Sequence, residues 1–387
     1  MYEFEKKKLK ALLGKELYSE LRDYNCYIAG GTITSLFCNR EINDVDVYFR
    51  SKQDLADFLY DNVEYSKWVL AKTNKALLID YKQMVDVQLI WFDTFDAAED
   101  IFDTFDYTVC MGAYDFKTEE FVLHKDFLQH NSQRILKYNS RTAFPIVSAL
   151  RVEKYKDKGY TISKPEFMRA LLTCMQLEID NYDDLKEQLG GMYGVDYDKI
   201  IKPKDGEAFS IATIIEKMQD ICLHDDYFKP KKETVEIDNF DKMVFEVTGI
   251  KKKYFKFKDE YYTIEDHCIS QEWSKPNPEL YIEVDLMTDL IKDNKLYKNV
   301  KKKDGRYFSY HDESFEYVIG EIVEPKNKES SRGGIYCSTK GDVKYATHSN
   351  KEDRVVLELE IESIDNIKNV DGDIVLHRCR VVGEVTE

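Results

Sequence analysis

The most constraining feature of this chain is a glycine pair, Gly30-Gly31, that follows one apolar run and precedes Asp44 and Asp46 in a second. In a strand, residues two apart point to the same face, so these two carboxylates should lie side by side. A third acid, Asp86, interrupts another apolar, strand-like run at 84–92. Such a position costs an aspartate roughly several kcal/mol unless it is paired, hydrogen-bonded or metal-bound. A cap or an edge-strand position is the alternative interpretation.

This layout predicts a site for phosphoryl or nucleotidyl transfer. Paired carboxylates suit Mg²⁺, which is commonly held by one or two acids together with substrate phosphates. We expect Asp44, Asp46 and Asp86 to bind two Mg²⁺ ions, with Asp86 also the candidate base. The glycines leave the backbone at a helix start open to a triphosphate. The residues expected to hold the NTP there are Gly30, Gly31, Thr32 and Ser35.

The stretch from about Cys26 to Phe49, together with Asp86, resembles the nucleotidyltransferases of the DNA polymerase β-like superfamily. The nearest likeness is to the head domain of tRNA CCA-adding enzymes and bacterial poly(A) polymerases. Later family segments are similar to residues 105–114 and 145–160, so the resemblance covers about residues 20–165. It implies a small mixed-sheet α+β head that transfers a nucleotide without a template. The implied acceptor is an RNA 3′ end such as that of tRNA.

The chain departs from the family at positions associated with nucleotide and primer binding. An arginine and an aspartate after the glycines are replaced by Thr34 and Ser35, and a later arginine and asparagine by Phe105 and Cys110. Asp106 matches the family and should either orient the nucleotide or support the sheet. A different basic set, spaced along one helix face, is the candidate for phosphate contacts. It consists of Arg151, Lys154 and Lys158.

With 387 residues, the chain is long enough for two to three domains. We expect a nucleotidyltransferase catalytic domain at 1–142, a helical domain at 143–228 and a β-rich domain at 234–387, with Lys229–Glu233 as a linker. Alternating apolar and charged residues, as in 354–362, predict antiparallel strands in the last domain. Its role is unknown, and a protein partner could bind there.

The expected elements of the first two domains follow from hydrophobic periodicity. Strands are predicted at 26–29, 44–49, 76–80, 84–92, 107–114 and 121–123. Helices are predicted at 1–24, 53–62, 94–102, 167–179, 181–189 and 210–222. Together they indicate an α+β class with a helical middle section and a β-rich C-terminal part.

The net charge bears on which molecule accepts the nucleotide, and the cysteines bear on the cellular location. A net charge of −17 is unusual for a protein that grips many phosphates. A protein side chain or a small molecule as acceptor, as in toxin-type members of the superfamily, is therefore an alternative, and so is a nucleotide-binding module without turnover. Eight scattered cysteines predict reduced thiols and a cytoplasmic location. No apolar run approaches the ~20 residues of a membrane span.

Overall fold

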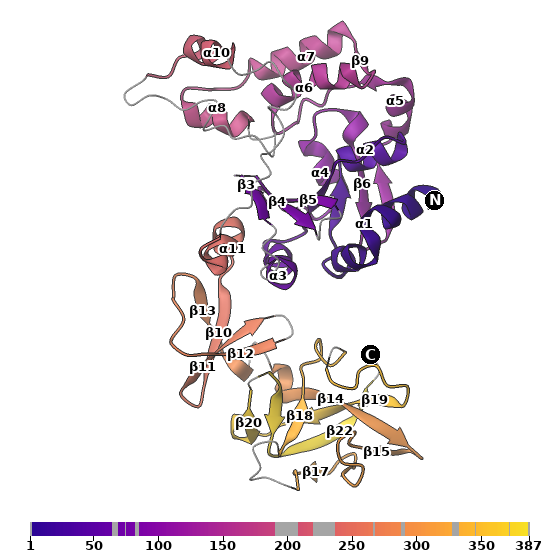
Figure 1. Cartoon of the computed structure of the whole chain (residues 1–387), viewed down its shortest axis with the longest axis vertical. Helices are drawn as coiled ribbons and strands as arrows, with labels where there is room; N and C mark the ends of the chain where they lie inside the picture. The colour runs from indigo at the N-terminus through magenta and orange to yellow at the C-terminus, as the bar shows by residue number, and fades with distance from the viewer. Residues whose placement is uncertain are drawn as a thin grey trace. The chain divides into compact units, whose positions relative to one another are not determined.

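The computed structural model describes residues 2–63, 69–73, 75–81, 85–189, 208–219, 237–265, 268–287, 291–326, 333–344, 346–370 and 372–385. The chain forms two compact units, Met1–Gly249 and Ile250–Glu387. The first unit combines helices with one large sheet, and the second is built mainly from strands (Figure 1). The expected α+β class is confirmed.

The first unit is organised around a seven-stranded sheet of order β3-β4-β5-β2-β1-β6-β7. Its strands are β1 (Tyr27–Ala29), β2 (Asp44–Tyr48), β3 (Val69–Lys72), β4 (Ala76–Tyr81), β5 (Val85–Ile90), β6 (Gly112–Asp115) and β7 (Glu120–Leu123). β2 and β5 pair in parallel, whereas the other neighbours pair antiparallel. The sheet is therefore mixed, as expected. A short parallel pair, β8 (Ile135–Leu136) and β9 (Thr161–Ile162), lies outside it.

Helices pack around this sheet and form a helical section beyond it (Figure 1). They are α1 (Glu3–Asp23), α2 (Gly31–Phe37), α3 (Lys52–Asn62), α4 (Ala98–Thr104), α5 (Phe127–Gln133), α6 (Pro145–Asp157), α7 (Lys164–Cys174), α8 (Tyr182–Leu189), α10 (Ile211–Gln219) and α11 (Phe240–Thr248). The amphipathic first helix is confirmed, since it buries Leu9, Leu13, Leu17 and Leu21. α7 begins at Lys164, three residues before the predicted start at 167, because the Ser163 side chain caps the helix by accepting a hydrogen bond from the backbone N–H of Glu166.

Two further predicted elements differ from the structure. The strand expected at 107–114 begins only at Gly112, and Thr108–Cys110 forms a 3₁₀ turn. Side-chain donors from Thr34 and Asn131 bond the carbonyl of Val109, which a strand would offer to its neighbour. The helix expected at 94–102 runs instead from Ala98 to Thr104. The proposed linker 229–233 lies outside the described residues.

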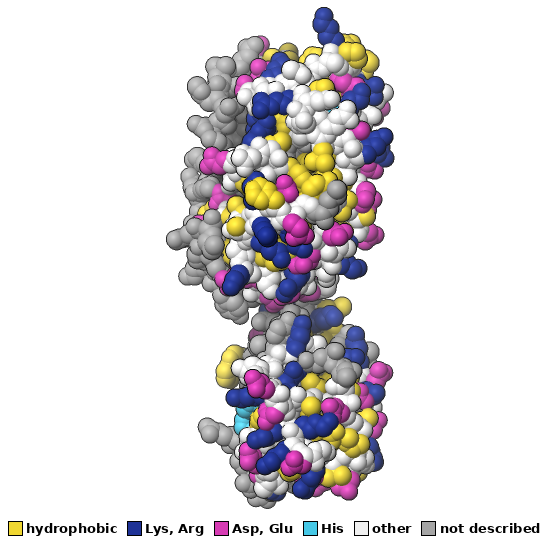
Figure 2. All heavy atoms as spheres, turned by 90° about the vertical axis from the view of Figure 1, so that its right-hand side faces the viewer, with side chains coloured by type: hydrophobic (Ala, Val, Ile, Leu, Met, Phe, Trp, Pro, Cys, Tyr) yellow, Lys and Arg dark blue, Asp and Glu magenta, His cyan; other side chains and the backbone are white. Residues whose placement is uncertain are grey.

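On the face drawn in Figure 2, Lys and Arg are interspersed with Asp and Glu. None of the described helices combines the length and apolar character needed to cross a membrane.

The second unit contains a six-stranded sheet of order β16-β15-β14-β19-β22-β17. These strands are β14 (Lys295–Lys303), β15 (Arg306–Phe308), β16 (Glu316–Tyr317), β17 (Ile322–Val323), β19 (Arg354–Glu360) and β22 (Cys379–Val385). All its neighbouring strands pair antiparallel, as the period-two pattern predicts. A three-stranded sheet adds β18 (Ile335–Cys337), β20 (Ile367–Asn369) and β21 (Ile374–Leu376).

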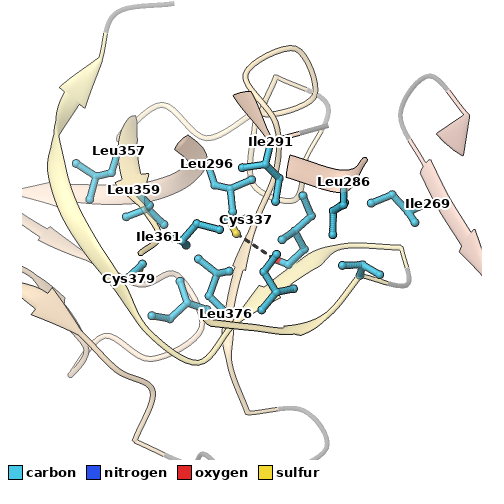
Figure 3. Close-up of a cluster of buried hydrophobic side chains, with 14 of the residues drawn as sticks. Ile269, Leu286, Ile291, Leu296, Cys337, Leu357, Leu359, Ile361, Leu376 and Cys379 are labelled. Atoms are coloured by element: carbon cyan, nitrogen blue, oxygen red, sulfur yellow. Dashed lines mark hydrogen bonds between the residues drawn. The ribbon is translucent and has the colours of Figure 1, made fainter. Parts of the chain in front are cut away.

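A four-stranded sheet completes this unit, with β10 (Lys252–Phe257), β11 (Glu260–Glu265), β12 (Cys268–Glu272) and β13 (Tyr281–Glu283). The sheets share one apolar core, where side chains from β14, β19 and β21 converge (Figure 3). Within it, the Cys337 thiol donates a hydrogen bond to the carbonyl of Ile374 at 3.0 Å. This core gives the second unit its own hydrophobic centre.

Candidate active site

Three predicted acids share one face of the first sheet. Along β2, Asp44 and Asp46 alternate with Val45 and Val47, which are fully buried on the opposite face. The parallel pairing with β5 places Asp44 opposite Asp86. Side chains of directly paired residues point to the same side of a sheet, so the three carboxylates face the same way. On the other edge of β5, Asp80 pairs with Asp86 and adds a fourth acid that the sequence analysis did not single out.

The carboxylates of β2 are held in an environment that disfavours their charge. Burial raises the pKa of Asp44, Lys154 and a hydrogen bond from Gln88 oppose the rise, and the charge of Asp86 adds to it. Burial, followed by the charge of Asp44, also raises the pKa of Asp46 well above its ordinary value. Buried like charges repel strongly, and a bound cation relieves that repulsion.

The predicted basic face of α6 is directed at these acids. The charges of Arg151 and Lys154 oppose the rise in the pKa of Asp46, and those of Lys154 and Lys158 oppose the rise in the pKa of Asp44. The guanidinium of Arg151 also donates a hydrogen bond to Asp106 across 3.2 Å. Asp106 is only 3% exposed, so a ligand has little access to its carboxylate. Its ion pair with Arg151 holds the guanidinium in place. The structure thus brings the three cations, the three acids and Asp106 into one region.

The glycine pair lies beside the acids. Gly30 has φ +79°, and a Cβ on it would lie 3.3 Å from the ring of Phe105 and 3.8 Å from a carboxylate oxygen of Asp46. A side chain is therefore disfavoured by the backbone conformation and by the close approach of the Phe105 ring. Gly31 is the first residue of α2, and a Cβ there would meet no atom within 4 Å. A ligand could approach the backbone of Gly31 without obstruction.

The two hydroxyl residues predicted to hold phosphate are placed differently. The hydroxyl of Thr32 donates a hydrogen bond to the backbone carbonyl of Asp44 at 3.1 Å, and Thr32 is buried. Its side chain therefore ties α2 to β2, which leaves its backbone N–H as the group available at the helix start. Ser35 is half-buried in the same helix.

Gln88 is a site residue that the sequence analysis missed. Its side-chain amide donates a hydrogen bond to the carboxylate of Asp44. The residue is 8% exposed, and its Oε1 has no hydrogen-bond partner among the described residues. A signal for it existed, because Gln88 stands two positions after Asp86 in the same strand and so shares its face.

The donor set fits a hard divalent cation. No three His, Cys, Asp or Glu side chains are already grouped as a metal-binding cluster in the described part of the chain. The pair Asp44 and Asp46, however, provides two adjacent oxygen donors whose mutual repulsion a cation would remove. Asp86, opposite Asp44 on the neighbouring strand, is the third acid within the same face.

Comparison with known proteins decides the family. The family model described as Gabija anti-defense 2 family protein matches residues 3–134. Gabija anti-defense 2 from Bacillus phage SPbetaL7 is 43% identical over 390 residues, which span 100% of this chain and 96% of the relative. The chain belongs to the Gabija anti-defense 2 family.

Solved structures similar to this chain include two CCA-adding enzymes. The CCA-adding enzyme of Bacillus stearothermophilus in complex with CTP has a TM-score of 0.32 and 14% identity, over 47% of this chain and 48% of that one. The CCA-adding enzyme of Thermotoga maritima complexed with tRNA has a TM-score of 0.32 and 12% identity, over 63% and 66%. The chain thus spans about half to two thirds of their length. Because these TM-scores are low, the fold of the first unit is described from its own strand order.

Proposed function

We propose that this member of the Gabija anti-defense 2 family is a nucleotidyltransferase that transfers NMP from an NTP to an acceptor hydroxyl. The observation that carries the proposal is the face formed by Asp44, Asp46 and Asp86 opposite the cations of α6. In the reaction, the acceptor oxygen bonds to the α-phosphorus, the bond to the β-phosphate oxygen breaks, and pyrophosphate leaves. The acceptor proton passes to a carboxylate, for which Asp86 is the candidate.

Asp44, Asp46 and Asp86 would hold the divalent ions, Mg²⁺ by preference. When bound, these ions would stabilise charge on the transferring phosphate and lower the pKa of the acceptor hydroxyl. Arg151, held by Asp106, and Lys154 would neutralise the triphosphate, with Lys158 at the end of α6 as a further contact.

The glycine turn has a separate task. Gly30 and Gly31 leave room for the triphosphate beside Asp46, and the first backbone N–H groups of α2 would donate to its oxygens. Thr32 contributes through its backbone, and Ser35 through its hydroxyl. Gln88 positions the carboxylate of Asp44.

The acceptor in this proposal is a component of the defence from which the family takes its name. Two observations support a protein hydroxyl over an RNA end: the net charge of −17 and the interspersed charges on the face in Figure 2. An RNA 3′ end stays the second candidate, because the basic residues of α6 gather at the acids and could hold an RNA terminus.

The experiment is a transfer assay with each α-labelled NTP and Mg²⁺, offered extracts of cells that carry the Gabija defence. Wild type is compared with Asp44→Asn/Asp46→Asn, and a third sample receives RNA purified from the same cells. Label in one protein band, dependent on both aspartates, supports the proposal, and label in RNA assigns the acceptor to nucleic acid. If the double variant still blocked the defence and wild type labelled nothing, the catalytic proposal would be wrong.

A further inference from the structure

The second unit contains a buried lysine that has no part in the site described above. Residues alternate along β14, so Lys298 shares a face with Leu296 and Val300, each 0% exposed. Lys298 itself is 9% exposed. A lysine in the apolar row of a central strand is costly unless its ammonium group is compensated. Its presence there calls for a partner.

The described residues compensate this ammonium only in part. Nζ donates one hydrogen bond, to the carbonyl of Tyr336 at 2.7 Å. No carboxylate of the described residues forms an ion pair with it, and burial lowers its pKa. An ammonium group has three N–H donors, so two are left without a protein acceptor in this part of the chain. An acceptor from solution would satisfy them.

Lys298 lines a cavity of about 60 Å³. One water molecule requires roughly 10–15 Å³, so the cavity admits a group of several atoms. The cavity lies along one edge of β14, at a stretch where this edge pairs with no strand in the described part of the chain. On that edge, β15 pairs with β14 only from Lys301 onward, and Tyr297 forms an isolated bridge to Ser338. Asn299, between these two contacts, also lines the cavity, and its side chain secures the loop opposite by bonding the carbonyl of Val343.

Two imidazoles stand at the same cavity. The Nε2 atoms of His311 and His348 are 3.3 Å apart. The ring of His348 stacks on Tyr310, with centroids 4.6 Å apart, and the Tyr310 hydroxyl is anchored on Asp353. Only one of the two nitrogens can donate to the other, whereas an oxygen atom placed beside both would accept from each.

We propose that this cavity binds a phosphate-type oxyanion, with Lys298 as its counter-ion and His311 and His348 as further donors. The source is either free phosphate or the phosphate group of a nucleotide, whose base could stack on Tyr310 or Tyr336. Asp373 also lines the cavity, but its carboxylate is exposed and hence screened by solvent. The site lies within the second unit and does not depend on nucleotidyl transfer.

The test is calorimetric titration of the full chain without divalent ions, using inorganic phosphate, AMP and adenosine in turn. Lys298→Met keeps the aliphatic stem, and Lys303→Met is the matched control on the exposed end of the same strand. We expect phosphate to bind wild type and Lys303→Met equally, and Lys298→Met about tenfold more weakly or worse. Tighter binding of AMP than of phosphate, with no binding of adenosine, would identify a nucleotide as the source.

A second variant guards against misfolding of the first. His348→Ala removes an imidazole at the cavity and should weaken phosphate binding while the thermal unfolding curve keeps its shape. Histidine ring signals in NMR spectra should shift on addition of phosphate to wild type and not to Lys298→Met. Wild type that binds no phosphate at millimolar concentration, or Lys298→Met that binds as wild type does, would overturn the proposal.

Discussion

The side-chain amide of Gln88 donates a hydrogen bond to the carboxylate of Asp44 across the parallel strand pair β2–β5. The amide nitrogen holds one oxygen of Asp44, which leaves the other free to bind a cation. Gln88 is also the residue of β5 that pairs with Asp46 of β2, so this one glutamine lies next to both acids. The carboxylate pair therefore depends on a residue that is itself uncharged.

Gln88→Met should lower nucleotidyl transfer about ten- to a hundredfold, because groups that orient metal ligands contribute on that scale. The fold should persist, since methionine has a similar volume and the variant removes a buried oxygen without a described partner. Activity and Tm are the two measurements. Gln53→Met, on the exposed surface of α3, is the control and should leave both unchanged. Equal activity of the two variants would exclude a positioning role for Gln88.

Asp46→Asn should stabilise the protein and abolish its activity. Burial and the charge of Asp44 raise the pKa of Asp46 to about 8. In metal-free buffer above that pH, where both carboxylates are ionised, the variant removes one of two repelling buried charges, and we expect its Tm to exceed that of wild type by about 2–4 °C. Added Mg²⁺ should raise the Tm of wild type and have no effect on the variant, since ligand binding stabilises only a protein that can bind it. A wild type whose Tm does not respond to Mg²⁺ would argue against the metal site.

The two glycines give opposite predictions. Gly30→Ala should destabilise the fold by about 1–3 kcal/mol, because its φ is positive and the new Cβ would press on Phe105. Gly31→Val should leave Tm unchanged, since nothing surrounds that position, and should raise the KM for NTP about tenfold or more. Denaturant unfolding and steady-state kinetics measure the two effects. An unaltered KM in Gly31→Val would remove the glycine turn from the nucleotide site.

The role of Arg151 can be separated from its pairing with Asp106. Arg151→Met should cost about 1–3 kcal/mol, between the values for surface and buried pairs, because its side chain is 33% exposed. Adding Asp106→Asn should restore much of that stability by removing the buried charge left behind. Activity should stay low in the double variant if Arg151 contacts phosphate. Full recovery of activity together with stability would make Arg151 purely structural.

The sequence predicted those parts of the site that depend on local pattern. Asp44, Asp46 and the glycine turn could be proposed as site residues because alternation along one strand and a glycine before a helix are visible in short segments. The bond from Gln88 to Asp44 was not, because it depends on the register of two strands far apart in the chain. The 3₁₀ turn at Thr108–Cys110 was missed for the same kind of reason: Thr34 and Asn131, distant in sequence, bond the Val109 carbonyl.

Glu166 connects α7 to the segment before it and makes stability depend on acid pH. Burial pushes its pKa up, but hydrogen bonds from the Lys137 ammonium and the Tyr138 backbone N–H outweigh burial, so the folded-state pKa lies below the ordinary value. The unfolded chain then binds the proton more readily, and the stabilisation is present at neutral pH and lost as pH falls through the folded-state pKa.

Glu166→Gln should therefore destabilise the protein by about 1–3 kcal/mol at neutral pH, where a charged acceptor of two hydrogen bonds is lost. The difference from wild type should shrink as the pH falls below about 4, because wild type becomes protonated there as well. Denaturant unfolding at several pH values measures it. Glu153→Gln, whose side chain on α6 is 75% exposed, is the control and should show little effect at any pH. If the difference in free energy of unfolding between wild type and Glu166→Gln stayed constant across the acid range, the negative charge of Glu166 would not be what stabilises α7.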